Sequence, residues 1–263
     1  MKIGIIGLGN IGHSLLQGLS KSGMDESIIA YDHNSQALQK AKNDFQNIRF
    51  SDCIEGIFTH SEVILVCIRT TQIEEFLFVS SKYFAERKTV VFLSAGVKID
   101  FFNKLLKESK AILLRAITNV NVASCVGYTF VLKSENEAAN KLVIDLFGKL
   151  GKVNEVGSEN QLDLFSLLSG CTPAIIATFF ESLVESGVAI GVPRMQTTEI
   201  IENTIHQTLK TIKDNNISAL ELKRRVCTPG GIVETQLEKL ENETEFKIDV
   251  AGWLPKILAS ASK

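Results

Sequence analysis

Proline, paired cysteines and an excess of charge are all scarce in this chain of 263 residues. Its four prolines are too few for a proline-rich disordered protein. The five cysteines are scattered and form no CxxC pair, which argues against a disulfide framework or a zinc site and favours a reducing, cytoplasmic compartment. The net charge of −2 at pH 7 argues against a broad nucleic-acid-binding surface.

Long apolar runs and metal-ligand patterns are also lacking. No uninterrupted apolar run approaches the roughly 18 residues of a membrane-spanning helix. The apolar run at the N-terminus is interrupted by Gly4, Gly7 and Gly9, so it is too short for a signal peptide. The four histidines have no partner at the spacing of metal ligands on a helix. We therefore expect no membrane, nucleic acid or metal among the partners of this chain.

The first half of the chain alternates short apolar runs with longer amphipathic ones. This pattern predicts an α/β domain with a parallel sheet covered by helices on both faces. The expected strands are residues 2–6, 27–31, 63–68, 89–93, 111–116 and 128–132, and the expected helices are 10–22, 35–45, 72–84 and 99–108.

The second half is predicted to be helical, because the strand pattern stops after about residue 133. Expected helices are 138–150, 162–168, 173–188, 193–213, 233–240 and 246–260. Three Ser/Glu or Ser/Gln pairs predict capping boxes at helix starts, namely Ser134 with Glu137, Ser158 with Gln161, and Ser218 with Glu221. The change of pattern predicts a dinucleotide-binding domain over residues 1–155 and a helical dimerisation and substrate domain over residues 156–263.

A glycine-rich motif stands between the first expected strand and helix. The residues Gly7, Leu8, Gly9, Asn10, Ile11 and Gly12 fit GxGxxG in the context that a dinucleotide-binding turn requires. Asp32 follows 20 residues after Gly12, at the end of the second expected strand, where a carboxylate can accept hydrogen bonds from the adenine ribose. An ordinary turn over residues 32–34 is the alternative interpretation. The carboxylate favours NAD(H), with NADP(H) possible.

An unusually apolar stretch covers residues 165–190. Such a helix is buried either in the core of its own chain or against a partner subunit. We favour a subunit interface, because the helical domain is too small to enclose so much apolar surface.

Motifs spaced along nearly the whole chain resemble those of the pyrroline-5-carboxylate reductase family. The family's GxGNMG is similar to residues 7–12, its AVKP segment to residues 66–70, its SxAAGV to residues 93–97 and its RxMPNTPA to residues 115–122. In the second half, SGSGPAY is similar to residues 169–175, the DAGV and GLPR segments to residues 185–188 and 191–194, and VxSPGGTT to residues 226–233.

The resemblance implies a Rossmann domain followed by an all-helical domain that dimerises by interleaving its helices, with larger rings in some members. It implies hydride transfer from NAD(P)H to a cyclic imino acid, giving proline, at a site completed by a loop of the partner subunit. The implied cofactor residues, besides the glycine motif and Asp32, are Cys67, Ile68, Arg69, Ala95 and Gly96. The implied substrate residues are Asn119, Thr228, Gly230, Gly231, Ile232 and Val233, with Thr228 and Val233 as the catalytic pair.

The substrate loop departs from the family pattern. Two threonines of the family are replaced by Ile232 and Val233, while the main-chain N–H groups of Gly230 and Gly231 are expected to bind the substrate carboxylate. Three alternatives therefore remain: a reductase of another imine, a non-catalytic nucleotide-binding relative, and a 3-hydroxyacid dehydrogenase. The last is disfavoured, because Lys210 lacks the KxxN context of that family's catalytic lysine.

Two acid–base candidates also have simpler interpretations. His206 falls on an expected helix without a predicted partner, so a surface or packed histidine is the favoured interpretation. Glu181 is equally compatible with an ion pair on a helix.

Overall fold

A computed structural model of the chain describes residues 1–243 and 252–257. The chain divides into two compact units, residues 1–170 and 171–263. The first unit is an α/β domain, and the described part of the second is helical. The predicted functional boundary near residue 155 stays a prediction.

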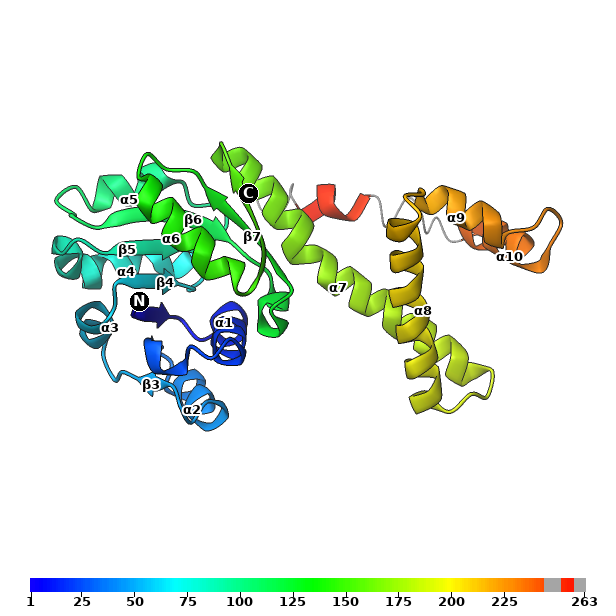
Figure 1. Ribbon diagram of the computed structural model, residues 1–263, viewed down its shortest axis with the longest axis horizontal. Coiled ribbons are helices and arrows are strands. Elements are labelled where there is room, and N and C mark those ends of the chain that lie inside the picture. The colour runs from blue at the N-terminus through cyan, green and yellow to red at the C-terminus, as the bar shows by residue number, and fades with distance from the viewer. Residues whose placement is uncertain (244–251, 258–263) are drawn as a thin grey trace. The chain divides into compact units, whose positions relative to one another are not determined.

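The first unit is built on one eight-stranded sheet (Figure 1). Its strand order is β3-β2-β1-β4-β5-β6-β7-β8. The strands are β1 (Ile3–Ile6), β2 (Ile28–Tyr31), β3 (Arg49–Phe50), β4 (Val63–Val66), β5 (Thr89–Phe92), β6 (Ile112–Ile117), β7 (Gly127–Leu132) and β8 (Gly151–Val156). Strand order reverses at β1, so the carboxyl ends of β1, β2 and β4 border the crevice where doubly wound sheets bind their ligands.

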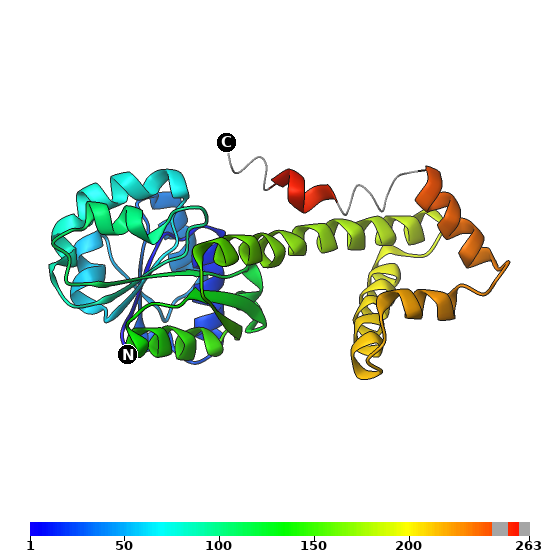
Figure 2. The same ribbon diagram turned by 90° about the horizontal axis from the view of Figure 1, so that it is seen from above.

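Helices cover both faces of this sheet, as predicted (Figure 2). They are α1 (Asn10–Lys21), α2 (Ser35–Asp44), α3 (Ile54–His60), α4 (Ile73–Ser80), α5 (Ile99–Leu105) and α6 (Glu137–Gly148). Successive strand residues point to opposite faces, so Leu65 joins the core under α1 and α6 while Ile64 and Val66 join the core under α3, α4 and α5. Each fully buried Leu or Ile side chain contributes about 1.5–3 kcal/mol to stability.

Two features of the sheet differ from the prediction. Strand β7 runs antiparallel to β6, because only a short 3₁₀ turn (Val120–Ser124) connects them and a parallel crossover needs a dozen residues or more. The prediction that strands end near residue 133 is wrong, since β8 pairs with β7 in parallel. Strand β8 lies at the sheet edge and is mostly polar, so it lacks the apolar run that marks a buried strand.

The predicted helix starts are only partly correct. Helix α6 is capped by Asn136, whose side chain accepts the N–H of Ala139 at 3.0 Å, whereas Ser134 instead donates its hydroxyl to Asn140 at 2.8 Å. Asn136 can reach the free N–H groups of the first turn, and Ser134 lies too far upstream. Ser218 caps its helix as predicted and accepts the N–H of Glu221 at 3.1 Å.

Residues 159–189 form one helix, α7 (Glu159–Ala189), where the sequence predicts two. Pro173 lies inside it and has no N–H, so the carbonyl of Ser169 loses its helical donor. The side-chain amide of Asn119 replaces that donor at 3.1 Å from the Ser169 oxygen. The same side chain accepts the N–H of Tyr128 at 3.3 Å. Proline therefore does not end the helix, because another element supplies the missing hydrogen bond.

The second unit contains the C-terminal half of α7 followed by α8 (Arg194–Asp214), α9 (Ala219–Val226) and α10 (Ile232–Glu243). Arg194 opens α8 and binds Glu181 and Glu185 of α7, which fixes the turn between the two helices. Of the expected helix 246–260, the structure describes only residues 252–257, and these are helical.

Within the described residues, α7 alone is long and apolar enough to cross a membrane by length and composition. A helix that packs against a partner subunit meets the same criterion.

Candidate active site

The glycine-rich turn has the backbone that the motif predicts. Gly7 adopts a left-handed φ of +92°, and a Cβ there would lie 2.8 Å from the carbonyl oxygen of Cys67. A Cβ on Gly12 would lie only 1.8 Å from the carbonyl oxygen of Gly7. A side chain at Gly7 would therefore collide with the residue that follows β4, and a side chain at Gly12 would force the start of α1 away from the turn. By contrast, a Cβ on Gly9 would have no atom within 4 Å, so the turn is open on the side where a phosphate would approach.

The N-terminus of α1 is suited to an anion. No side chain caps it, and its first turn carries no acidic residue. Its N–H groups and the positive end of its dipole are therefore available to a pyrophosphate. Leu8 is buried and Ile11 packs against the core, so both anchor the turn, whereas Asn10 is exposed at the helix start.

Asp32 links the end of β2 to the glycine turn. Its Oδ2 accepts the N–H of Leu8 at 2.6 Å and its Oδ1 accepts the N–H of Asn34 at 2.7 Å. The side chain is 9% exposed. Because each carboxylate oxygen can accept two hydrogen bonds, both oxygens retain acceptor capacity for ribose hydroxyls. The turn over residues 32–34 is thus real, and it is compatible with the ribose role that the motif predicts.

A small cavity of about 170 Å³ is lined by Gly7 and by Tyr31 and His33, the residues on either side of Asp32. Its walls include Tyr31, Ile54, Ile68 and Phe76, with Glu75 also on the lining. Burial, followed by the charge of Asp32, raises the pKa of the Tyr31 hydroxyl. No sequence pattern indicates this cavity, because its residues come from separate elements and match no motif.

The two loops that follow β4 and β5 are tied together. Ser94 donates its hydroxyl to the carbonyl of Ile68 at 2.9 Å, and Thr70 donates its hydroxyl to the carbonyl of Ala95 at 2.9 Å. Cys67 is held at the end of β4 by its N–H, which binds the carbonyl of Ile6 at 2.7 Å. Burial raises the pKa of the Cys67 thiol far above its usual range, so it stays protonated.

A buried arginine helps to link the segment after β5 to helix α7. Arg115 on β6 is 1% exposed and binds Glu159 and Asp163 of α7, both at 2.9 Å. The same carboxylate oxygens accept main-chain N–H groups of the connection between β5 and α5, Glu159 from Ile99 at 2.6 Å and Asp163 from Gly96 at 3.4 Å. The guanidinium thereby anchors the predicted cofactor residue Gly96 to α7. The RxMPN-like motif marks Arg115 in the sequence, but nothing local names its partners.

The predicted cofactor residues therefore gather at the carboxyl ends of β1, β2, β4 and β5. Asn119 belongs to the same unit, and both ends of its amide are engaged by main-chain groups.

The predicted substrate loop lies in the second unit. Gly230 has a left-handed φ of +73°, which allows a tight turn that is closed by the N–H of Gly231 on the carbonyl of Thr228 at 2.8 Å. The N–H of Gly230 binds the carboxylate of Glu234 at 2.7 Å. Ile232 is 82% exposed and Val233 is 46% exposed. The main-chain N–H groups of Gly230 and Gly231, which are expected to bind a substrate carboxylate, thus have acceptors within the chain.

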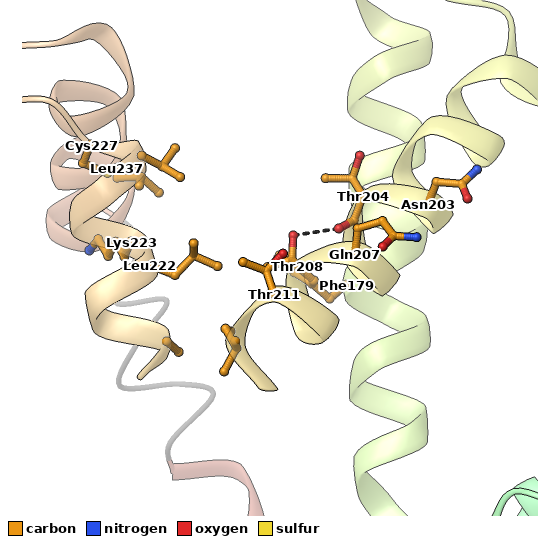
Figure 3. Close-up of a pocket in the computed structure, with 13 residues that line it drawn as sticks. Phe179, Asn203, Thr204, Gln207, Thr208, Thr211, Leu222, Lys223, Cys227 and Leu237 are labelled. Carbon is orange, nitrogen blue, oxygen red and sulfur yellow. Dashed lines mark hydrogen bonds between the residues drawn. The ribbon is translucent and has the colours of Figure 1, made fainter. Parts of the chain in front are cut away.

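The second unit also contains a large open groove of about 860 Å³ (Figure 3). Phe179 of α7, Leu222 and Val226 of α9, and Leu237 of α10 contribute apolar walls. Thr208 of α8 lies across from Leu222 and Leu237, where its hydroxyl binds the carbonyl of Thr204 at 2.7 Å and leaves its methyl group free for apolar contact.

The two acid–base candidates take the simpler roles. Glu181 is ion-paired with Arg194 between α7 and α8, and His206 is exposed on α8. Within the described residues, no group of His, Cys, Asp and Glu side chains could hold a metal ion.

Two family models match the chain, and both agree with this geometry. The dimerisation domain of pyrroline-5-carboxylate reductase matches residues 159–251, and the coenzyme F420-dependent NADP oxidoreductase domain matches residues 2–96. Pyrroline-5-carboxylate reductase of Aquifex aeolicus (strain VF5) is 28% identical over 100% of this chain and 97% of the relative. The chain is therefore similar to pyrroline-5-carboxylate reductases along its whole length.

Further pyrroline-5-carboxylate reductases match the chain over a similar span. Pyrroline-5-carboxylate reductase of Escherichia coli (strain K12) is 25% identical over 100% of this chain and 97% of the relative. The Plasmodium falciparum pyrroline carboxylate reductase, solved with NADP bound, superposes with a TM-score of 0.88 at 23% identity, covering 99% of this chain and 97% of that one. The predicted fold, a Rossmann domain followed by a helical dimerisation domain, is confirmed.

Proposed function

We propose that the chain reduces pyrroline-5-carboxylate to proline with a nicotinamide cofactor, and that NADH is preferred over NADPH. The observation that carries the proposal is the intact dinucleotide-binding turn in a chain that matches pyrroline-5-carboxylate reductases over its full length. The reaction adds one hydride to the carbon and one proton to the nitrogen of the C=N bond. A bound reduced nicotinamide supplies the hydride.

The residues of the first unit fit this cofactor. The uncapped start of α1 and the open space above Gly9 suit the pyrophosphate. Asp32 supports NADH, because its carboxylate accepts from ribose hydroxyls and repels a 2′-phosphate. The cavity lined by Tyr31, Ile54 and Phe76 suits the adenine ring, and the tied loops at Ile68 and Ala95 suit the nicotinamide half.

The substrate residues act mainly by position. An imine that is already protonated is electrophilic, so the protein needs to hold it and exclude water more than it needs a nucleophile. The loop from Thr228 to Val233 is the proposed holder, with Thr228 as its remaining hydroxyl and Val233 at the position of a family threonine. Substrate contact by Asn119 would have to accommodate its existing bonds to Ser169 and Tyr128.

We further propose a cytoplasmic homodimer or larger homo-oligomer, with the helical region as its interface. Leu168, Ile176 and Phe179 of α7, with Leu209 of α8 and Val226 of α9, are more than one third exposed in the single chain. So large an apolar surface marks an interaction site. Five free cysteines fit a reducing compartment.

The direct test is NADH oxidation with pyrroline-5-carboxylate supplied, together with proline detection. Turnover that depends on the imine supports the proposal. Binding of NADH without any turnover would leave the chain as a nucleotide-binding relative without this activity.

A second candidate is reduction of a different, less polar imine. Ile232 and Val233 favour it, because their side chains are exposed on the loop where the family has hydroxyls. A hydrogen bond from a placed hydroxyl contributes about 0.5–1.5 kcal/mol. The double replacement Ile232→Thr with Val233→Thr should therefore raise kcat for pyrroline-5-carboxylate about tenfold, which corresponds to about 1.4 kcal/mol. High activity in the unmodified protein would contradict this second candidate.

A further inference from the structure

A histidine lies directly beside the carboxylate that is proposed to select the cofactor. His33 follows Asp32 in the turn after β2, and its Nδ1 lies 3.4 Å from Oδ1 of Asp32. This distance exceeds the roughly 2.7–2.9 Å of a charge-assisted hydrogen bond, so the two side chains interact mainly through their charges. The side chain of His33 is 65% exposed, whereas that of Asp32 is 9% exposed. The nearly buried anion therefore has a neighbour that solvent can protonate.

The imidazole also lines the cavity that suits the adenine half of the cofactor. His33 shares this wall with Gly7, Tyr31 and Phe76. Among the residues that the structure describes, its Nε2 has no hydrogen-bond partner. A carboxylate in the position of Asp32 accepts from the ribose hydroxyls, and the 2′-phosphate of NADPH replaces one of these hydroxyls. The cavity thus places an ionisable ring at the point where NADH and NADPH differ.

The other titratable groups around His33 supply no positive charge. Asp32 and Tyr31 lie at the end of β2, Glu75 lines the cavity from α4, and Cys53 lies near Tyr31 just ahead of α3. Burial, and after it the charge of Asp32, raises the pKa of the Tyr31 hydroxyl, so the tyrosine stays neutral. The first turn of α2, which follows directly, has no charged side chain. No lysine or arginine is among the described residues that line the cavity, so a protonated His33 is the cation that this wall can offer to a phosphate.

We propose that His33 is a specificity-determining residue whose protonation shifts the cofactor preference toward NADPH. A neutral imidazole leaves the charge of Asp32 to repel a 2′-phosphate, whereas an imidazolium offsets that charge and can donate its Nε2–H to the phosphate. Histidine side chains ordinarily change charge between about pH 5 and pH 8, so the preference for NADH weakens as the pH falls through this range. The proposal rests on the proposed function, because it takes the crevice at β1, β2 and β4 to bind the nicotinamide cofactor.

The test measures the dissociation constants of NADH and NADPH for the full chain by fluorescence titration, from about pH 6 to about pH 8.5. His33→Asn removes the titrating ring and keeps a polar group, and His33→Lys places a cation there over the whole range. His60→Asn is the matched control, because His60 is an exposed histidine at the end of α3 in the same unit. A phosphate monoester itself titrates near about pH 6, and the His33→Asn variant measures that contribution alone. Thermal melting establishes that each variant is folded.

We expect the ratio of the NADPH to the NADH dissociation constant to fall with pH about fivefold more in the wild type than in His33→Asn, which is the upper end of what an exposed ion pair contributes. The change should lie mainly in the constant for NADPH, because NADH has no 2′-phosphate. His33→Lys should show the low ratio at every pH, and His60→Asn should follow the wild type.

The same pH dependence of the ratio in the wild type and in His33→Asn would overturn the proposal and leave the proposed function standing. An equal effect of pH on both dissociation constants would also overturn it, since that result gives His33 a role in the shape of the cavity and none in discrimination. A wild-type chain that binds neither nicotinamide cofactor would refute the proposed function, and this proposal with it.

Discussion

Asp32 combines two tasks in a single side chain. It holds the glycine turn through Leu8 and closes its own turn through Asn34, and it still presents acceptor capacity at the end of β2. A carboxylate that is fixed by two main-chain bonds cannot swing away from a cofactor phosphate. The proposed preference for NADH therefore rests on a charge that the main chain holds in place.

The first prediction concerns this charge. In Asp32→Asn the single amide oxygen can accept the N–H of Leu8 but not that of Asn34 as well, and the charge is lost. We expect the preference for NADH over NADPH to fall about tenfold, because the repulsion of the 2′-phosphate is removed. Fluorescence titration with both cofactors measures it, and Asp52→Asn, an exposed carboxylate, is the control. Equal binding of the two cofactors by the unmodified protein would restrict Asp32 to its turn.

The second residue-scale prediction concerns the Cys67 thiol. Because burial raises its pKa in the folded state, the folded protein keeps the proton where the unfolded chain, with a Cys pKa of about 8.5, releases it. The free energy of unfolding should therefore fall above about pH 8.5, by at most about 1.4 kcal/mol per pH unit from this group. Urea unfolding between pH 7 and 10 measures the slope, which Cys67→Ala should reduce. At pH 8, iodoacetamide should label the exposed Cys53 and spare Cys67; the opposite order of labelling would be inconsistent with this argument.

At the scale of elements, α7 continues through a proline because a neighbouring loop completes its hydrogen bonding. The Ser169 carbonyl freed by Pro173 is bound by Asn119, which also holds the start of β7. One side-chain amide thus binds both a helix carbonyl that lacks its usual donor and a main-chain N–H at the start of a strand.

This arrangement predicts coupling between two distant positions in the sequence. Asn119→Ala should destabilise the protein by about 1–3 kcal/mol, because the half-buried Ser169 carbonyl loses its donor. In a Pro173→Ala background, residue 173 has an N–H of its own, so the same change should cost clearly less. A double-mutant cycle by denaturant unfolding gives the coupling free energy. Additive effects in the cycle would show that Asn119 does not serve the Ser169 carbonyl.

The elements also show which parts of the molecule can be predicted from sequence. The glycine turn, α1 and Asp32 were predicted because their requirements are local, namely a strand, a left-handed residue and a helix start. Strand β8 was missed because an edge strand with Lys152 and Asn154 has no apolar run. The partners of Arg115 lie 44 and 48 residues away, and the cavity at Tyr31 combines several elements, so neither leaves a local pattern.

At the scale of the whole molecule, the single chain leaves apolar surface uncovered. The groove in Figure 3 has Leu222 and Leu237 on one side, facing Thr208 and Thr211 on the other. An interface of this kind is consistent with the dimerisation domain that matches residues 159–251.

The corresponding prediction is a stable dimer or larger assembly at micromolar concentration. Leu222→Asp should weaken it by a factor of ten or more, because about 1.5–3 kcal/mol of apolar burial is lost and a charge is buried. Sedimentation velocity measures the assembly. Leu105→Asp, at an exposed apolar position on α5, is the control and should leave it unchanged. A monomer in the unmodified protein would contradict the prediction.

The edge position of β8 has a consequence for solubility. An outer strand with unpaired main-chain groups invites pairing with a strand of another molecule, which leads to aggregation. Here the strand carries exposed Lys152, Asn154 and Glu155, and β3 at the opposite edge is only two residues long. Both edges of the sheet thus resist strand addition. At high concentration we therefore expect molecules to associate through their helices and not through their sheets.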